Sequence, residues 1–226
     1  DDGKLLDDGT VTRIGEQSFR LTAAEPQYRW LALNAVGMQV QVTELTEQMA
    51  ALSLQGPKSR AVLNLACEQP VDALKYFRMA FNRIAGKAVS VSRTGYTGDL
   101  GFEIWMDAAD ALGVWDALMA AGHDYGITPT GILAMDMARV EAGLFMLDVD
   151  YTSASHAWIP GQRSSPYEMG LGWTVNLDKQ GYFVGRRALE REHREGSSWQ
   201  LAGLEIDWEG LEREYAAVGM PPQVPA

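Results

Sequence analysis

Cysteine, histidine and runs of basic residues are all scarce in this sequence. The one cysteine among the 226 residues is Cys67, so neither a disulfide framework nor a zinc site built from cysteines can form. The 19 Lys and Arg are outnumbered by 30 Asp and Glu, which gives a net charge of −11. An acidic chain without a basic run is a poor partner for nucleic acid or an anionic membrane surface, so neither is expected.

Other signals are missing as well. No apolar run reaches membrane-spanning length, and no signal peptide is visible, which fits a reducing, cytoplasmic compartment. The three histidines, His123, His156 and His193, show no paired spacing, so no metal site is expected. The sequence starts inside an apparent hairpin and ends in the linker-like segment 221–226, so we expect a partial chain.

The residues that are present predict a mixed α+β fold. Apolar residues make up 46% and charged residues 22%, which is ordinary for a globular protein with a core. Alternation predicts strands and 3.6-residue periodicity predicts helices, without a regular βαβ order, which favours antiparallel sheets. The predicted strands are 10–14, 18–21, 40–42, 49–54, 89–92, 102–106, 171–177 and 201–208, and the predicted helices are 26–36, one from Gly56-Pro57, 108–121, 130–141 and 185–195.

The most informative stretch is the glycine-rich turn within 92–104. Its glycines at 95, 98 and 101 do not match a dinucleotide fingerprint, because a strand pattern and not a helix follows them. The glycines alone favour a tight hairpin in which φ is positive. Glu103 lies in the following strand beside a turn that would let a ligand approach closely. The strand pattern alone favours a solvated Glu, and a ligand contact is the alternative.

This stretch closely resembles the S-R-T-G-Y-T-G-E-x-G-F-E-I segment of the glycine-cleavage T-protein family. Four other segments resemble family motifs in the family's order, and together they cover nearly the whole chain. They are 5–8 for x-I-D-D, 54–57 for x-Q-G-P, 139–143 for R-L-E-A-G and 183–189 for F-I-G-R-x-A-L.

The resemblance implies two intertwined, antiparallel-sheet α+β subdomains that form a folate site, followed by a C-terminal β-barrel. On that plan, residues 1–195 form the folate-binding domain without its N-terminal part, with 50–128 as an inner α+β subdomain. Residues 196–226 are then a linker or the start of a truncated barrel. The implied activity is tetrahydrofolate-dependent transfer of an aminomethyl or methyl carbon, although the partial chain could be inactive by itself.

The resemblance also assigns roles to three residues. The first Asp of the Asp-Asp pair, which matches Asp7, lies by the reactive N5 of tetrahydrofolate and serves catalysis; without the family it reads as a turn residue. The motif glutamate, which matches Glu103, binds the pterin ring, whose adjacent N–H donors suit a carboxylate. Tyr96 matches the motif tyrosine, and lining the folate pocket and packing within the hairpin are equal alternatives for it.

Departures from the family pattern concern the one-carbon donor. Met135 stands where glycine-cleavage members have the Arg of A-R-D, and Leu147-Asp148 replaces their L-Y-G. These features resemble the folate domains of sarcosine and dimethylglycine dehydrogenases and related demethylases. A small methylated or aminomethylated donor is therefore implied, with a lipoyl carrier protein as a further partner. The alternative is a folate-binding accessory protein of iron–sulfur maintenance, but residues 180–187 lack the cysteine of its K-G-C-Y-x-G-Q-E motif.

Overall fold

The structure is a computed structural model that describes residues 2–221. The chain divides into two compact units. The larger unit is Asp7–Ser153, and the smaller unit joins residues 2–6 to residues 154–221. The boundary of the folate-binding domain at residue 195 stays a prediction, because compactness alone does not define where a ligand binds.

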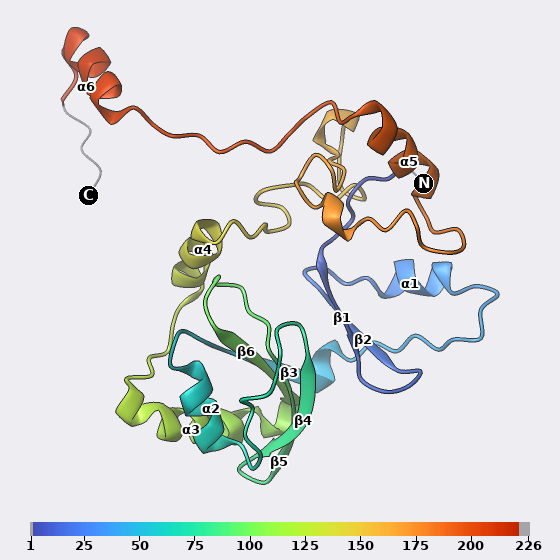
Figure 1. Cartoon of the computed structure of the whole chain (residues 1–226), viewed down its shortest axis with the longest axis vertical. Helices are drawn as coiled ribbons and strands as arrows, with labels where there is room; N and C mark the ends of the chain where they lie inside the picture. The colour runs from blue at the N-terminus through green and yellow to red at the C-terminus, as the bar shows by residue number, and fades with distance from the viewer. Residues whose placement is uncertain (1, 222–226) are drawn as a thin grey trace. The chain divides into compact units, whose positions relative to one another are not determined.

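A four-stranded antiparallel sheet forms the centre of the larger unit (Figure 1). Its strands are β3 Met49–Gln55, β4 Met79–Ile84, β5 Lys87–Ser92 and β6 Gly101–Asp107, in the order β3-β6-β5-β4. The hairpin predicted around the glycine-rich turn therefore occupies the two central positions, and its antiparallel pairing is confirmed. The edge strand β4 was not predicted.

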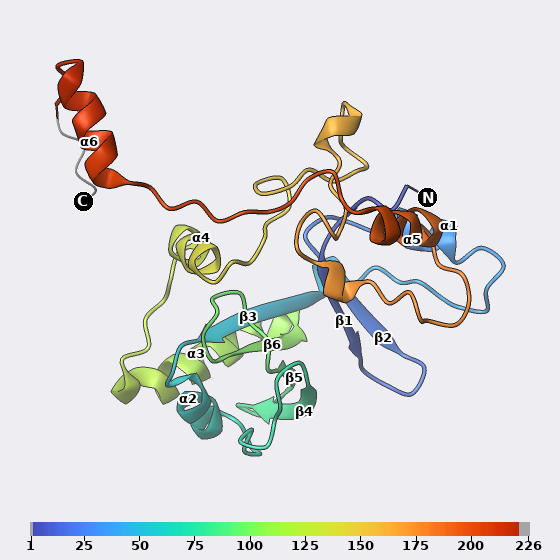
Figure 2. The ribbon, with the colours of Figure 1, turned by 45° about the horizontal axis from the view of Figure 1, so that its top comes forward.

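One face of this sheet carries the hydrophobic core. Helices α2 Ser59–Ala66 and α3 Ala111–Gly122 lie together on that face (Figure 2). Alternate residues of β6 point toward them, because side chains of a strand point in turn to opposite faces. The fully buried apolar side chains are Leu63, Ile84, Val91, Phe102, Ile104 and Val114.

The opposite face of the sheet is polar and aromatic. Glu103 lies between Ser53 and Ser92 in the strand register, and Trp105 lies between Ala51 and Ser90 in the next row. Directly paired residues of an antiparallel sheet share one face. This face of the sheet therefore carries Glu103, whereas the helix-covered face is apolar.

Further elements of the larger unit match their predictions. The strands β1 Gly9–Arg13 and β2 Phe19–Ala23 pair antiparallel, α1 spans Tyr28–Asn34, and α4 spans Ile132–Glu141. The Asp107 side chain accepts a hydrogen bond of 2.9 Å from the Ala109 amide and so caps the 3-10 turn Ala108–Asp110, whereas α3 itself begins at Ala111, later than the predicted start at 108.

Three predicted strands are wrong. Residues 40–42 are irregular, Gly172–Thr174 is a short 3-10 turn within the predicted strand 171–177, and residues 201–207 are irregular before the unpredicted helix α6 Trp208–Ala217. Alternation makes a strand only where a partner strand supplies hydrogen bonds, and none pairs with these segments within residues 2–221. The described residues form no closed barrel, and the expectation that residues 196–226 are a linker or the start of a truncated barrel stays a prediction.

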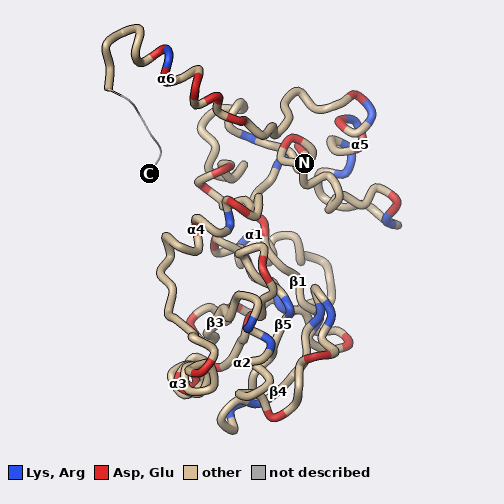
Figure 3. Tube along the Cα trace, turned by 60° about the vertical axis from the view of Figure 1, so that its left-hand side comes forward, with Lys and Arg blue, Asp and Glu red and all other residues tan. Residues whose placement is uncertain are grey.

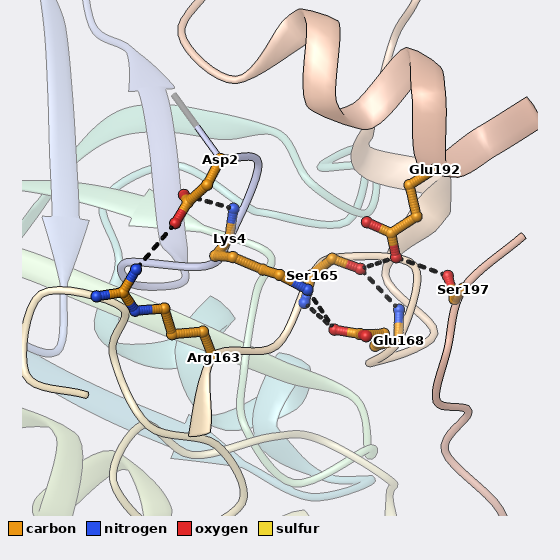
Figure 4. Close-up of polar contacts among 7 residues, drawn as sticks. All are labelled: Asp2, Lys4, Arg163, Ser165, Glu168, Glu192 and Ser197. Atoms are coloured by element: carbon orange, nitrogen blue, oxygen red, sulfur yellow. Dashed lines mark hydrogen bonds and ion pairs between the residues drawn. The ribbon is translucent and has the colours of Figure 1, made fainter. Parts of the chain in front are cut away.

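Polar contacts hold the smaller unit together around helix α5 Arg186–Glu195, which ends at Gly196 as predicted (Figure 4). The buried Glu168 carboxylate accepts 2.8 Å and 2.7 Å bonds from Lys4 Nζ and the Ser165 amide. The Ser165 hydroxyl in turn donates to Glu192 of α5. These bonds tie the N-terminal residues to the segment that precedes α5.

Charges are mixed along the described chain. Lys and Arg are interspersed with Asp and Glu, and the described residues present no continuous basic stretch (Figure 3). A search of the described helices for one with the length and apolarity to cross a bilayer finds none.

Two phenylalanines test where the core lies. Phe102 is fully buried on β6, whereas Phe81 on β4 is 66% exposed. We expect Phe102→Ala to lower the free energy of unfolding by about 3–5 kcal/mol, because a large cavity opens in the core. The matched Phe81→Ala change should cost less than about 1 kcal/mol. Urea denaturation of both variants measures this, and equal losses would contradict the assignment of the two faces.

Candidate functional site

Hydrogen bonds fix the Glu103 side chain at the polar face of the sheet. One oxygen, Oε2, accepts a 2.5 Å bond from the Thr94 hydroxyl. The Thr94 hydroxyl lies 2.8 Å from the Ser92 hydroxyl. Because the single hydroxyl hydrogen of Thr94 is donated to Glu103, Ser92 is the donor in this second pair. The other oxygen, Oε1, accepts no hydrogen bond from the described residues. Glu103 is therefore a half-buried carboxylate with one oxygen available.

The glycine-rich turn beside Glu103 is built around the side chain of Gln55. A Cβ at Gly95 or Gly101 would lie 2.1 Å or 1.7 Å from Gln55 Oε1, so any other residue there would displace the Gln55 side chain. Gly98 is the one of the three with a positive φ, +76°. The prediction of positive φ is therefore right for Gly98 alone, and the other two glycines let the Gln55 side chain approach the turn closely.

An arginine from the β1–β2 hairpin reaches the same face of the sheet. The Arg20 guanidinium lies 4.5 Å from the centre of the Trp105 ring, and its Nη1 donates a 3.1 Å bond to the Ser90 hydroxyl. Burial lowers the pKa of Arg20, and the nearby negative charge of Glu103 acts in the opposite direction. Arg20 was not predicted, because its spacing from Glu103 in the sequence gives no signal.

The two residues of the Asp-Asp pair are bound very differently. Asp7 accepts four hydrogen bonds, two to each oxygen, and their donors are the amides of Asp8, Ala24 and Glu25 and the side chain of Gln27. The Asp8 carboxylate is exposed and accepts a 2.5 Å bond from the hydroxyl of buried Tyr151. Asp7 thus fastens the segment before α1, while Asp8 keeps one oxygen open. The partner Tyr151 was not predicted.

Tyr96 extends from the glycine-rich turn toward the segment that follows α4. Its hydroxyl donates to the Phe145 carbonyl. Burial raises the pKa of Tyr96, the charges of Asp8 and Asp150 act in the same sense, and Arg139 opposes them. Tyr96 therefore lies within electrostatic reach of Asp8, while Thr94 of the same turn binds Glu103.

A buried arginine fixes the segment that carries Tyr151. The Arg139 side chain on α4 is only 3% exposed, and it donates to the Leu144 carbonyl and to the carboxylates of Asp136 and Asp150. Burial works against its charge, but the hydrogen bonds with both carboxylates raise the pKa of Arg139. Asp150 also accepts a 2.7 Å bond from the Met146 amide, which closes the turn ahead of Tyr151.

The candidate residues thus form two groups that the glycine-rich turn connects. Glu103, Thr94 and Arg20 form the sheet group; Asp7, Asp8 and Tyr151 form the aspartate group. That Asp7 and Glu103 face one common pocket stays a prediction. A cavity of about 260 Å³ lies elsewhere in this unit, against β4, and no candidate residue lines it. Burial raises the pKa of Cys67 to about 11, so its thiol is not a ready nucleophile at neutral pH.

The buried tyrosine gives a test by pH. Burial, and then the bond to Asp8, raise the pKa of Tyr151 in the folded chain. Its contribution to stability is complete below about pH 10, the pKa of an unfolded Tyr, and declines above it because only the unfolded chain ionises readily. We expect the stability advantage of the wild type over Tyr151→Phe to shrink above pH 10, by at most about 1.4 kcal/mol per pH unit.

Chemical denaturation at several pH values between 7 and 11 measures the difference in the free energy of unfolding between the wild type and Tyr151→Phe. Tyr76→Phe, at a side chain that is 67% exposed, is the control, and its free energy of unfolding should change with pH as that of the wild type does. Parallel curves for the wild type and Tyr151→Phe would show that Tyr151 is not buried in this way.

Comparisons with known proteins agree with the motifs. The family model of the GCVT N-terminal domain matches residues 1–179. An aminomethyltransferase of Halothermothrix orenii is 35% identical over 94% of this chain and 58% of its own length. A trimethylamine-oxide aldolase of Ruegeria pomeroyi is 39% identical, over 91% of this chain and 26% of its own length.

A solved structure shows the same fold. The glycine cleavage system aminomethyltransferase T of Bartonella henselae matches with a TM-score of 0.73 and 28% identity, over 87% of this chain and 51% of that chain. The chain thus spans little more than half the length of these aminomethyltransferases. The matched range, the identities and the shared fold place it in one family: the chain belongs to the family of the GCVT N-terminal domain, that of the glycine-cleavage T-proteins.

Proposed function

We propose that the chain is the folate-binding part of a tetrahydrofolate-dependent one-carbon transferase. The observation that carries this proposal is the Glu103 carboxylate, held by Thr94 on the polar face of the sheet with Oε1 unengaged. The similarity to proteins named aminomethyltransferase supports the reaction class. Such proteins are longer than this chain, and what their remaining residues contribute to activity is not part of this proposal.

Glu103 suits the amino-pyrimidine edge of a pterin. That edge presents a ring N–H beside an exocyclic amino group, and a carboxylate can accept two parallel hydrogen bonds from such neighbouring donors. Thr94 keeps the carboxylate in place, so little conformational entropy is lost on binding. Tyr96, from the same turn, is the proposed side wall of the folate site.

The Asp-Asp pair is proposed to act on the reacting amine. Transfer to or from N5 of tetrahydrofolate changes charge on that nitrogen, and a fixed carboxylate stabilises positive charge as it develops. The four hydrogen bonds on Asp7 give it a fixed orientation. The neighbouring Asp8 has the more accessible carboxylate, so the catalytic role proposed for Asp7 must be tested against Asp8.

The proposed donor is a small methylated or aminomethylated amine. Met135 stands at the position on α4 where glycine-cleavage members carry an Arg. A thioether cannot form the ion pairs of that Arg. The relative named for trimethylamine-oxide breakdown also favours a methylated amine. A lipoyl carrier protein remains the proposed partner if the donor is the aminomethyl group of glycine cleavage.

Glu103→Gln tests the pterin contact. Loss of a charge-assisted bond costs about 1.5–3 kcal/mol, so the dissociation constant for tetrahydrofolate should rise about 10- to 100-fold. Isothermal titration under anaerobic conditions measures it. Glu68→Gln, at an exposed side chain, is the matched control and should bind as the wild type does. Unchanged binding by Glu103→Gln would remove this residue from the site.

Asp7→Asn tests the proposed catalytic role. We expect tetrahydrofolate affinity to be kept and single-turnover transfer to fall by about 100-fold or more, because the carboxylate acts on charge that develops only during transfer. Turnover is measured with a donor that the wild type accepts. Asp8→Asn is measured in parallel. Loss of transfer in Asp8→Asn but not in Asp7→Asn would move the role to Asp8, and equal loss of binding and transfer would leave Asp7 a purely structural role.

A further inference from the structure

The Arg20 guanidinium is incompletely partnered although it is half-buried. Its Nε atom is buried without a hydrogen-bond acceptor, and Nη1 alone donates a bond, to Ser90. No carboxylate lies within ion-pair distance of Arg20 in the described part of the chain. A buried donor group without an acceptor is costly, so an incompletely bonded arginine at a sheet face is a candidate ligand contact.

The position of Arg20 relates it to Glu103. Arg20 stacks on Trp105, which lies two residues from Glu103 on the same face of β6. Residues two apart in a strand are separated by about 7 Å, a distance that the side chains of Arg and Glu readily bridge. Stacking on the ring also limits the orientations of the planar guanidinium. The face of the sheet thus presents an acceptor and, one row away, a cationic donor.

This order of groups matches a complete pterin edge. In a 4-oxo pterin, the 2-amino group and the N3–H are donors, and the C4 carbonyl oxygen beside them is an acceptor. We propose that Arg20 donates to the C4 oxygen of the pterin while Glu103 accepts from the two neighbouring donors. Arg20 then selects 4-oxo over 4-amino pteridines, because a 4-amino group places a second donor against the guanidinium. This inference rests on the proposed function of the Glu103 site.

The proposed contact between Arg20 and the C4 oxygen is specific because an analogue without that oxygen leaves the guanidinium donor unpaired. A site built to donate to an oxygen rejects an analogue that lacks the oxygen, because its own donor is then left unsatisfied. The effect of Arg20 should therefore appear only when the ligand carries a C4 oxygen. If Arg20 only packs the hairpin on Trp105, its substitution should change the affinity for both kinds of ligand equally.

A matched pair of ligands tests this. Tetrahydrofolate and tetrahydroaminopterin differ at C4 and, as a consequence, at N3, which carries a hydrogen only in the 4-oxo compound. Each is titrated into the wild type and Arg20→Met. The wild type should bind tetrahydrofolate about 10- to 100-fold more tightly than the 4-amino analogue. Arg20→Met should lose the part of that preference that comes from the C4 oxygen, through weaker tetrahydrofolate binding with the analogue changed by less than about threefold. The part that comes from the N3–H on Glu103 is kept. Arg13→Met, on the same hairpin and bonded only to backbone carbonyls, is the control.

Each contrary outcome has a distinct meaning. If the wild type binds neither ligand, the proposed function itself fails. If Arg20→Met weakens both equally, the C4 contact is wrong while the folate site stands. If the wild type binds both equally, the contact of Glu103 with N3–H is wrong as well. Unchanged folate binding with weaker binding of a carboxylate-bearing donor such as N-methylglycine would assign Arg20 to the donor instead. Should Arg20→Met fail to fold, Arg20→Gln titrated with the same two ligands still decides the question.

Discussion

The alternation of side chains along β6 is the constraint on which the rest of the larger unit depends. Phe102, Ile104 and Met106 must enter the core against α2 and α3, and the period of two then directs Glu103 and Trp105 to the other face. Pairing with β3 and β5 on both sides fixes this register, so a slip of one residue would exchange core and site together. The packing that forms the core therefore also fixes the face of the sheet that carries Glu103.

Around that face, the polar contacts combine into a continuous arrangement within the larger unit. The glycine-rich turn packs on Gln55, presents Thr94 to Glu103, and extends Tyr96 toward the region of Asp8. On the other side, the Arg139 network closes the turn before Tyr151, which binds Asp8. This one turn thus connects two groups of residues that are far apart in the sequence.

The sequence predicted those features that local patterns determine. The central hairpin, α3 and α4 follow from periodicity, caps and glycines, and the family segments identified Asp7, Tyr96 and Glu103 as candidates. The three wrong strands alternate in sequence but have no partner strand, and β4 went unnoticed because its alternation is weak. Arg20, Tyr151 and the bonding of Arg139 depend on tertiary contacts, and no sequence spacing reports those.

The central claim is that the polar face of the sheet at Glu103 binds the pterin. A crystal structure of the chain with 5-formyltetrahydrofolate, a stable reduced folate, tests it most directly. The account predicts the amino-pyrimidine edge of the pterin within hydrogen-bond distance of the Glu103 carboxylate, on the face opposite α2 and α3. A pterin bound elsewhere, with Glu103 still bonded only to Thr94, would contradict it.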